Sequence, residues 1–449
     1  MSIPRKHVRR LALVVAVALI GSVHIASAEE RPGTIAALSR APIGALRAAI
    51  GSDGSRPRDL GDAHLRRNSP VRSGVPGIES LANFVDQFQA DGFDSNNNPK
   101  SVWPYSMVGA APETNRTTVF DASIIPVTIE LVNAAGNVVS VGGQPLVLPV
   151  TPDIVRNLLQ SPIYEDFKYT SGTGQYGDQI MRAQFWNRIG HHGNGDEGYH
   201  NLLRPSVETT RVIKFPATKA LVLLNDDAAH TCCQLMILDF TTFVNLLFPA
   251  TDTDTATPIG AAEHAGEMTT RGIATLLFNN IYLADIADVA HTCCVLGFHA
   301  YDLEPGNAKN GNRERRFVMN YASWISNGLF GGGFEDITAA SHEMAELFAD
   351  PFVDNETPWW LSRDPFGNGG LCQNNLENGD VIEVLSSNAT FSASLHDRTY
   401  HPQNVALFSW FAFESPSTAR LQAYSFPDET TLTALSPHPL LGPDCTPVP

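Results

Sequence analysis

Residues 336–351 read DITAASHEMAELFADP, and this stretch predicts a helix. At about 100° per residue its apolar side chains gather on one side as a packing stripe. The stripe consists of Ile337, Ala340, Met344, Leu347 and Phe348. Asp336 or Thr338 can cap the start of this helix, and Pro351 ends it.

The opposite side of the helix carries the residue types of a metal site. His342, Glu346 and Asp350, spaced four residues apart, share that side, and Glu343 lies beside them. Two ligands one turn apart present an imidazole nitrogen and a carboxylate oxygen to one cation, and zinc is the ion we predict. Glu343 would then lie next to a water held by the metal. There it could accept the proton of that water as general base while the metal polarises a substrate carbonyl.

This arrangement follows the logic of the His-Glu-x-x-His metallopeptidases, with Glu346 in place of the second histidine. A carboxylate at that position lowers the net charge of the site and makes its zinc a weaker Lewis acid. The alternative is that the polar side of the helix is the solvated face of an ordinary amphipathic helix.

A zinc site also needs a third protein ligand, and four residues are candidates. Asp350 lies on the correct side of the helix but precedes the proline that ends it. Glu377 and Asp380 lie downstream, where zincin-like folds commonly supply their last ligand, and Cys372 could fix that loop. His299 could be a ligand or could hydrogen-bond a transition state. We rank Asp350 and Asp380 first.

The N-terminus predicts export. A cationic start is followed by the apolar run of residues 11–20 and by the small residues Ala26, Ser27 and Ala28, so residues 1–28 have the pattern of a signal peptide. The apolar run is too short for a membrane anchor, and we expect a periplasmic or extracellular location. The formal net charge of −17 becomes more negative once the basic residues of this segment are removed. That charge disfavours nucleic acid and anionic membranes as partners.

Composition and pattern divide the rest of the chain into four parts. Residues 29–77 are rich in Arg, Ser, Pro and Gly and are interpreted as a linker or pro-segment. Residues 78–219 form a β-rich N-terminal region, residues 220–430 a zincin-like α+β region, and residues 431–449 a Pro-rich tail. Strands and helices alternate without a regular βαβ rhythm, which predicts the α+β class, with a mixed sheet and an active-site helix in the C-terminal half.

Individual elements can also be predicted. Apolar residues at helical spacing indicate a helix at the start of ordered structure; they are Ile78, Leu81, Phe84, Val85 and Phe88. β-branched residues between turn signals indicate strands within residues 117–150. We further expect a helix near residues 175–186 and strands at residues 220–224 and 235–240.

The sequence contains six cysteines, and the five-residue segment AHTCC occurs twice, at residues 229–233 and 290–294. In an exported chain most of them should be oxidised. The simplest interpretation is a cross-link between these two segments through their vicinal cysteines, with Cys372 and Cys445 as the remaining pair. The vicinal cysteines are Cys232, Cys233, Cys293 and Cys294. The alternative is a metal site made by the two His-x-Cys-Cys units.

The helix motif resembles a signature found in secreted bacterial proteins loosely related to the plant exordium (phosphate-induced) family. That signature reads Ser-His-Glu-x-x-Glu-x-x-Thr-Asp-Pro, and Ala349 stands where threonine is usual. Shorter segments are similar to other blocks of those proteins: GQYGDQIMRAQFW (174–186), CVLGFHAY (294–301), Trp359-Trp360 and ENGD (377–380). Members of this group are described as zinc-metallopeptidase-like.

Together these features predict an exported zinc-dependent hydrolase, most simply a peptidase that acts on a peptide or protein substrate. The rival class is a non-catalytic secreted binding or cell-surface protein, as the exordium resemblance permits.

Overall fold

The computed structural model describes residues 77–442 and 445, except residues 142, 191–197, 225–233, 331–332, 364–369, 384–388, 438–440 and 443–444. Two short segments near the N-terminus, β1 (Ala12–Leu13) and β2 (Ala16–Val17), pair with a strand of the main sheet. Apart from these segments and residue 77, the predicted signal peptide and linker lie outside the described residues. None of the described helices combines the length and the hydropathy needed to cross a membrane.

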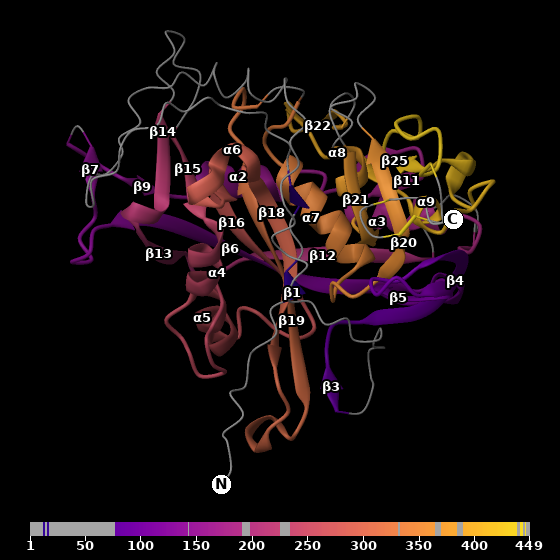
Figure 1. The fold of residues 1–449 in the computed structure, drawn as a ribbon, viewed down its shortest axis with the longest axis horizontal. Coiled ribbons are helices and arrows are strands. Elements are labelled where there is room, and N and C mark those ends of the chain that lie inside the picture. The colour runs from indigo at the N-terminus through magenta and orange to yellow at the C-terminus, as the bar shows by residue number, and fades with distance from the viewer. Residues whose placement is uncertain are drawn as a thin grey trace.

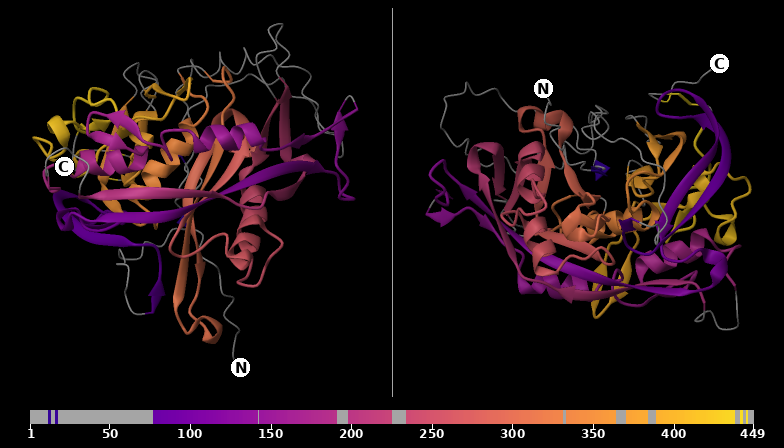
Figure 2. Two further views of the ribbon diagram at one scale, coloured as in Figure 1. Left: turned by 180° about the vertical axis from the view of Figure 1, so that it is seen from behind. Right: turned by 90° about the horizontal axis from the view of Figure 1, so that it is seen from below.

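A large mixed sheet forms the centre of the molecule (Figure 1). Its strand order is β12 (His200–Val207), β6 (Thr117–Val132), β16 (Ile273–Asn279), β19 (Glu314–Trp324), β18 (Val295–Glu304), β17 (Ile281–Ala284), β15 (Gln234–Asp239) and β14 (Ala220–Leu224). The first four strands are parallel, whereas β18 is antiparallel to both of its neighbours in this order. β13 (Arg211–Pro216) extends the sheet along the second half of β6. The long strands curl (Figure 2), and both predicted regions contribute to this one sheet. A mixed α and β fold is therefore confirmed.

Helices cover both faces of the sheet. Along β18, Tyr301 packs into a core with α7 (Thr338–Ala349) and α3 (Tyr176–Gln184). Phe298 and Ala300 pack into a second core with α4 (Phe240–Leu247) and α5 (Pro258–Ala265). Successive side chains of a strand point to opposite faces, so Gly297 and His299 lie on the Tyr301 side, under α7.

The predicted helix near residue 78 is wrong. This segment forms β4 (Asn83–Phe93), which pairs with β5 (Pro99–Val108) in an antiparallel hairpin. Phe84 and Phe88 are both buried. Their spacing of four residues is an even number, so it places both on one face of a strand as well as on one side of a helix.

The remaining elements are short. They are β3 (Ile78–Glu79), β7 (Ser140–Val141), β8 (Gln144–Pro145), β9 (Val147–Leu148), α2 (Pro152–Leu159), β10 (Phe167–Tyr169), β11 (Gly172–Gly174), α6 (Val289–Thr292), β20 (Glu356–Arg363), β21 (Gly370–Asn375), α8 (Asp380–Glu383), β22 (Ala393–Leu395), β23 (Arg398–Tyr400), β24 (Val405–Ala406), α9 (Phe408–Phe411) and β25 (Ser425–Phe426). The predicted strands within residues 117–150, the helix near residue 180 and the strands near residues 222 and 237 are confirmed by β6 to β9, α3, β14 and β15.

α7 is confirmed as a helix, and it ends before Pro351 as predicted. Its N-cap is Ile337, and no side chain caps it, so the prediction that Asp336 or Thr338 does so is wrong. Asp336 instead accepts the Ile337 N–H, and the Thr338 hydroxyl donates to the carbonyl of His401. All twelve residues of α7 are buried, so the polar side is not a solvated face.

Among the cysteines that the structure describes, two pairs lie at disulfide distance. Cys293 pairs with its neighbour Cys294, so the predicted cross-link from these two cysteines to the other AHTCC segment is wrong. Cys232 and Cys233 lie outside the described residues. The second pair joins Cys372 and Cys445, whose Cα atoms are 5.8 Å apart. It ties β21, which precedes the ENGD segment, to the C-terminus.

Candidate metal centre

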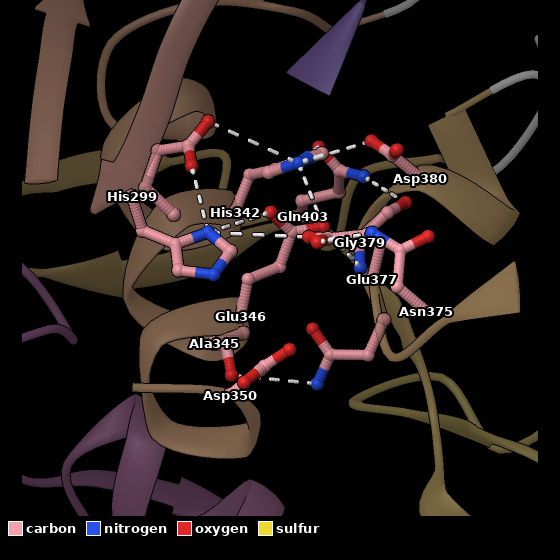
Figure 3. Close-up of polar contacts among 12 residues, drawn as sticks. His299, His342, Ala345, Glu346, Asp350, Asn375, Glu377, Gly379, Asp380 and Gln403 are labelled. Carbon is pink, nitrogen blue, oxygen red and sulfur yellow. Dashed lines mark hydrogen bonds and ion pairs between the residues drawn. The ribbon is translucent and has the colours of Figure 1, made fainter. Parts of the chain in front are cut away.

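Three parts of the fold meet at the polar side of α7. β18 supplies His299, α7 supplies His342, Glu343 and Glu346, and the segment that leads into α8 supplies Glu377 and Asp380. Figure 3 shows the side chains of His299, His342, Glu346, Glu377 and Asp380 pointing toward one another. All six residues are buried, with relative exposures of 3% or less.

The ring of His342 faces carboxylates on two sides. Its Nε2 lies 3.1 Å from Glu346 Oε1 and 3.4 Å from Asp380 Oδ1, and Glu343 Oε1 lies 3.9 Å away. Glu383, at the end of α8, completes a group with His342 and Asp380 whose ligand atoms lie within 4.8 Å of one another.

Gln403 fixes the orientation of the His342 ring. The Gln403 side-chain N–H donates to the carbonyl of Gly379 at 2.8 Å, so its Oε1 is the atom that faces His342. That oxygen lies 2.9 Å from Nδ1 and can only accept, so Nδ1 carries the proton. In the neutral ring Nε2 therefore presents a lone pair to Glu346 and Asp380. A histidine whose other nitrogen donates to an oxygen in this way is the usual arrangement of a metal ligand.

His299 faces a second set of carboxylates. Its Nδ1 lies 3.4 Å from Glu346 Oε2, 3.7 Å from Glu343 Oε2 and 3.9 Å from Glu377 Oε2. Glu346 thus lies between the two histidines, with one oxygen toward each ring. Its Oε1 also accepts the Gly379 N–H at 3.1 Å, which helps to hold the carboxylate.

Two glycines leave room for these side chains. A Cβ atom on Gly297 of β18 would lie 2.6 Å from Cγ and Oε1 of Glu343. A Cβ atom on Gly379 would lie 2.6 Å from Nδ1 of His342. Neither residue has a positive φ, so space rather than backbone conformation favours glycine at both positions.

Many polar atoms of the cluster make no hydrogen bond. They are Nδ1 and Nε2 of His299, Nε2 of His342, both carboxylate oxygens of Glu343, and one oxygen each of Glu346, Glu377, Asp380 and Glu383. A buried polar atom without a partner costs about 1–3 kcal/mol, and more if it is charged. Buried polar atoms usually have a partner, and a bound cation is one kind of partner that these ligand atoms could share. Buried His, Glu and Asp groups here could hold a metal ion.

Burial dominates the electrostatics of the carboxyl groups. It raises the pKa of Glu343 to about 7, against the lowering effect of His342. It also raises the pKa of Asp380 to about 6 and that of Glu383 to about 8. Burial, together with the charges of Glu346 and Asp380, holds the pKa of Glu377 well above its ordinary value. Only Glu346 has a lowered pKa, because attraction to His342 and His299 outweighs its burial.

Burial has the opposite effect on the histidines, whose pKa it lowers, but the neighbouring carboxylates outweigh it. Burial lowers the pKa of His299, but its contacts with Glu343 and Glu346 raise it further, to about 10. The pKa of His342 is raised well above its ordinary value by Glu346 and Glu343 in spite of burial. Without a cation these histidines would hold protons to offset the carboxylates. Binding of a metal would release those protons.

A pocket adjoins the cluster. Its lining includes Gly297, His342, Glu343, Glu383 and Gln403. His342 and Glu343 therefore both face this small pocket, which has room for about one water molecule.

The structure brings together five of the sequence-predicted ligands but not Asp350. Both oxygens of Asp350 accept backbone N–H groups, from Asp354 at 3.0 Å and Asn355 at 3.1 Å. It belongs to none of the groups of described residues whose ligand atoms lie close enough together to hold a metal ion. Figure 3 shows it at the far end of the helix. The prediction of Asp350 as a ligand is therefore corrected: it stabilises the turn after α7.

Sequence reasoning missed two residues. Glu383 follows Asp380 by three residues, a spacing that places both on one side of a short helix and could have been recognised. Gln403 carried no such signal, because nothing in its sequence surroundings indicates that it contacts His342. Comparison of the chain with protein-family models, with curated proteins and with solved structures finds no match in any of the three.

Proposed function

We propose that the protein is an exported zinc-dependent hydrolase with a zincin-like site on α7, and that it cleaves peptide bonds. The observation that carries this proposal is the position of His342 Nε2, which lies 3.1 Å from Glu346 Oε1 and 3.4 Å from Asp380 Oδ1 while Gln403 holds the other ring nitrogen.

The separations at His342 support a small tetrahedral cation. Ligands held tetrahedrally at about 2.0–2.1 Å from zinc are about 3.3–3.4 Å apart. Nε2 of His342 lies 3.1 Å from the Glu346 oxygen and 3.4 Å from the Asp380 oxygen. His342 could therefore hold zinc together with either carboxylate. Glu346 and Asp380 do not belong to one group of ligand atoms within 4.8 Å, so they would have to approach each other to bind the same ion. One coordination position would remain open to a ligand from outside the protein.

Glu343 is suited to proton transfer. A zinc ion at this position would supply a Lewis acid that polarises a substrate carbonyl. Glu343 lines the adjoining pocket, and neither of its oxygens makes a hydrogen bond. It would accept the proton of the attacking water and deliver it to the leaving nitrogen. Burial raises the pKa of Glu343, which favours a group that both accepts and releases a proton.

The peptide substrate is favoured by the helix motif. Its first histidine and following glutamate occupy the positions that ligand and general base have in His-Glu-x-x-His peptidases. The resemblance to secreted bacterial metallopeptidase-like proteins favours the same chemistry and a periplasmic or extracellular location. The net charge of −17 disfavours nucleic acid and anionic membranes as partners.

The burial of the site favours a second candidate. All six residues of the cluster are 3% exposed or less, and a closed metal site commonly serves structure rather than catalysis. The second candidate is therefore a non-catalytic secreted binding or cell-surface protein. In it the metal would hold the segment that leads into α8 against α7.

Metal analysis and a peptide library separate the two candidates. The wild-type protein should contain zinc and cleave some library peptides in a chelator-sensitive way, and His342→Ala and Glu346→Ala should each contain less zinc than the wild type. Glu343→Gln should keep metal and fold but lose about 10²–10⁴-fold in rate. His200→Gln is the control, because His200 pairs with Asp178 outside the cluster; it should keep metal and rate.

Each outcome has one meaning. Zinc without cleavage by the wild type would support the binding protein. Equal metal content in wild type, His342→Ala and Glu346→Ala would exclude these ligands and the proposed hydrolase mechanism with them. Cleavage that survives in Glu343→Gln would exclude Glu343 as the base.

A further inference from the structure

The zinc site at His342 leaves half of the cluster unused. His299 is fully buried, and neither of its ring nitrogens makes a hydrogen bond. Glu377 is held by one oxygen, which accepts the Asn375 side-chain N–H at 2.8 Å. Its other oxygen makes no hydrogen bond and faces His299. A single cation beside His342 satisfies none of these atoms.

Glu346 has the geometry of a bridging ligand. Its Oε1 lies 3.1 Å from His342 Nε2, and its Oε2 lies 3.4 Å from His299 Nδ1. The two oxygens of one carboxylate thus face two different imidazoles. Two separate groups of ligand atoms share this residue: one contains His342, the other His299 and Glu377.

The number of carboxyl groups in the cluster also favours a second cation. Five carboxyl groups gather here: Glu343, Glu346, Glu377, Asp380 and Glu383. Among the described residues their ion-pair partners are the two histidines, and no lysine or arginine is among them. If all five are ionised, one divalent cation offsets two of the negative charges, and a second offsets two more. Isolated charges are costly to bury, so two cations account for the cluster better than one.

We propose that the centre binds two divalent cations side by side, bridged by Glu346. His342 and Asp380 hold the first, and His299 and Glu377 hold the second. This proposal deepens the proposed function and rests on it. Paired cations about 3.5–4 Å apart stabilise both the attacking and the leaving atoms of a hydrolysis. Glu343 lies within 3.9 Å of both rings, where it can serve an attacking water held between the two sites.

The test counts metal ions and asks whether they are neighbours. The protein is stripped with chelator, saturated with Mn²⁺, freed of excess, and analysed for manganese content and by electron paramagnetic resonance. We expect about two Mn²⁺ per chain with the spectrum of a spin-coupled pair. His299→Gln and His342→Gln should each hold about one ion with an uncoupled spectrum. His200→Gln is the matched control, because His200 pairs with Asp178 outside the cluster, and it should retain two coupled ions.

The outcomes distinguish this proposal from the proposed function. One ion per wild-type chain, or two uncoupled ions, would overturn the paired site, while chelator-sensitive cleavage with that single ion would leave the hydrolase standing. No bound ion at all would overturn both. If His299→Gln does not fold, Glu377→Gln replaces it, and retention of the coupled pair in that variant would also overturn the assignment.

Discussion

Replacing Gly297 by alanine tests whether the position of Glu343 controls the chemistry. The new Cβ would lie 2.6 Å from Cγ and Oε1 of Glu343, whereas ordinary contacts begin near 3.4 Å, so the carboxylate must retreat by about 0.8 Å. The backbone itself accepts alanine, because φ at Gly297 is not positive. The substitution therefore acts on Glu343 through a side-chain contact alone.

Two effects of different size follow from that retreat. Overpacking of a buried site costs about 1–3 kcal/mol of unfolding free energy. Displacement of a catalytic group by about 1 Å can cost about 10²-fold in rate. His342, Glu346 and Asp380 are not touched, so metal content should stay at the wild-type level. The assays are urea unfolding, metal analysis and the rate of cleavage of a peptide that the wild type cleaves.

Two further variants isolate the cause. Glu343→Asp in the Gly297→Ala background shortens the displaced side chain by one methylene group, so it should recover stability without recovering rate. Gly379→Ala places its Cβ 2.6 Å from His342 Nδ1, so it should lose metal and rate together. A Gly297→Ala protein with wild-type rate and stability would refute the argument, as would parallel loss of metal and rate in that variant.

Three more predictions concern the support of the site. Gln403→Leu removes the oxygen that fixes the His342 ring and should weaken metal binding about 10–100-fold, as measured by chelator competition; unchanged affinity would contradict the role of Gln403. Cys372→Ser with Cys445→Ser opens a link across 73 residues and should lower the unfolding free energy by about 4 kcal/mol in urea titrations, whereas reduction of the wild type should reproduce the loss. The hydrogen bond from His401 to Asp336 raises the pKa of His401, so its contribution to stability is complete below the unfolded value of about 6.5 and disappears as pH rises through the folded value. The urea midpoints of wild type and His401→Gln should therefore differ more at pH 5.5 than at pH 9, and a difference that grows with pH would reverse the assignment.

The sequence predicted α7 as a helix because helix period, apolar stripe and terminal proline agree over residues 336–351. It ranked Asp350 as a ligand because position on a helix side does not show where the following turn takes the carboxylate. The helix predicted over β4 failed because Phe84 and Phe88 fit both periods. The contact of Gln403 with His342 and the second set of carboxylates around His299 depend on how distant segments fold over α7. The local sequence pattern does not contain that information.

α7 has no surface on which its sequence can vary. An ordinary amphipathic helix tolerates substitution on its outer side, so a saturation-mutagenesis profile shows sensitive and permissive positions alternating with the helical repeat. All twelve residues of α7 are buried, and its ionisable residues lie between β18 and the segment that leads into α8. Its profile should be flat and uniformly sensitive. In homologous sequences, substitutions would then accumulate around the helix and hardly within it. The helix would remain a short conserved segment in a divergent chain.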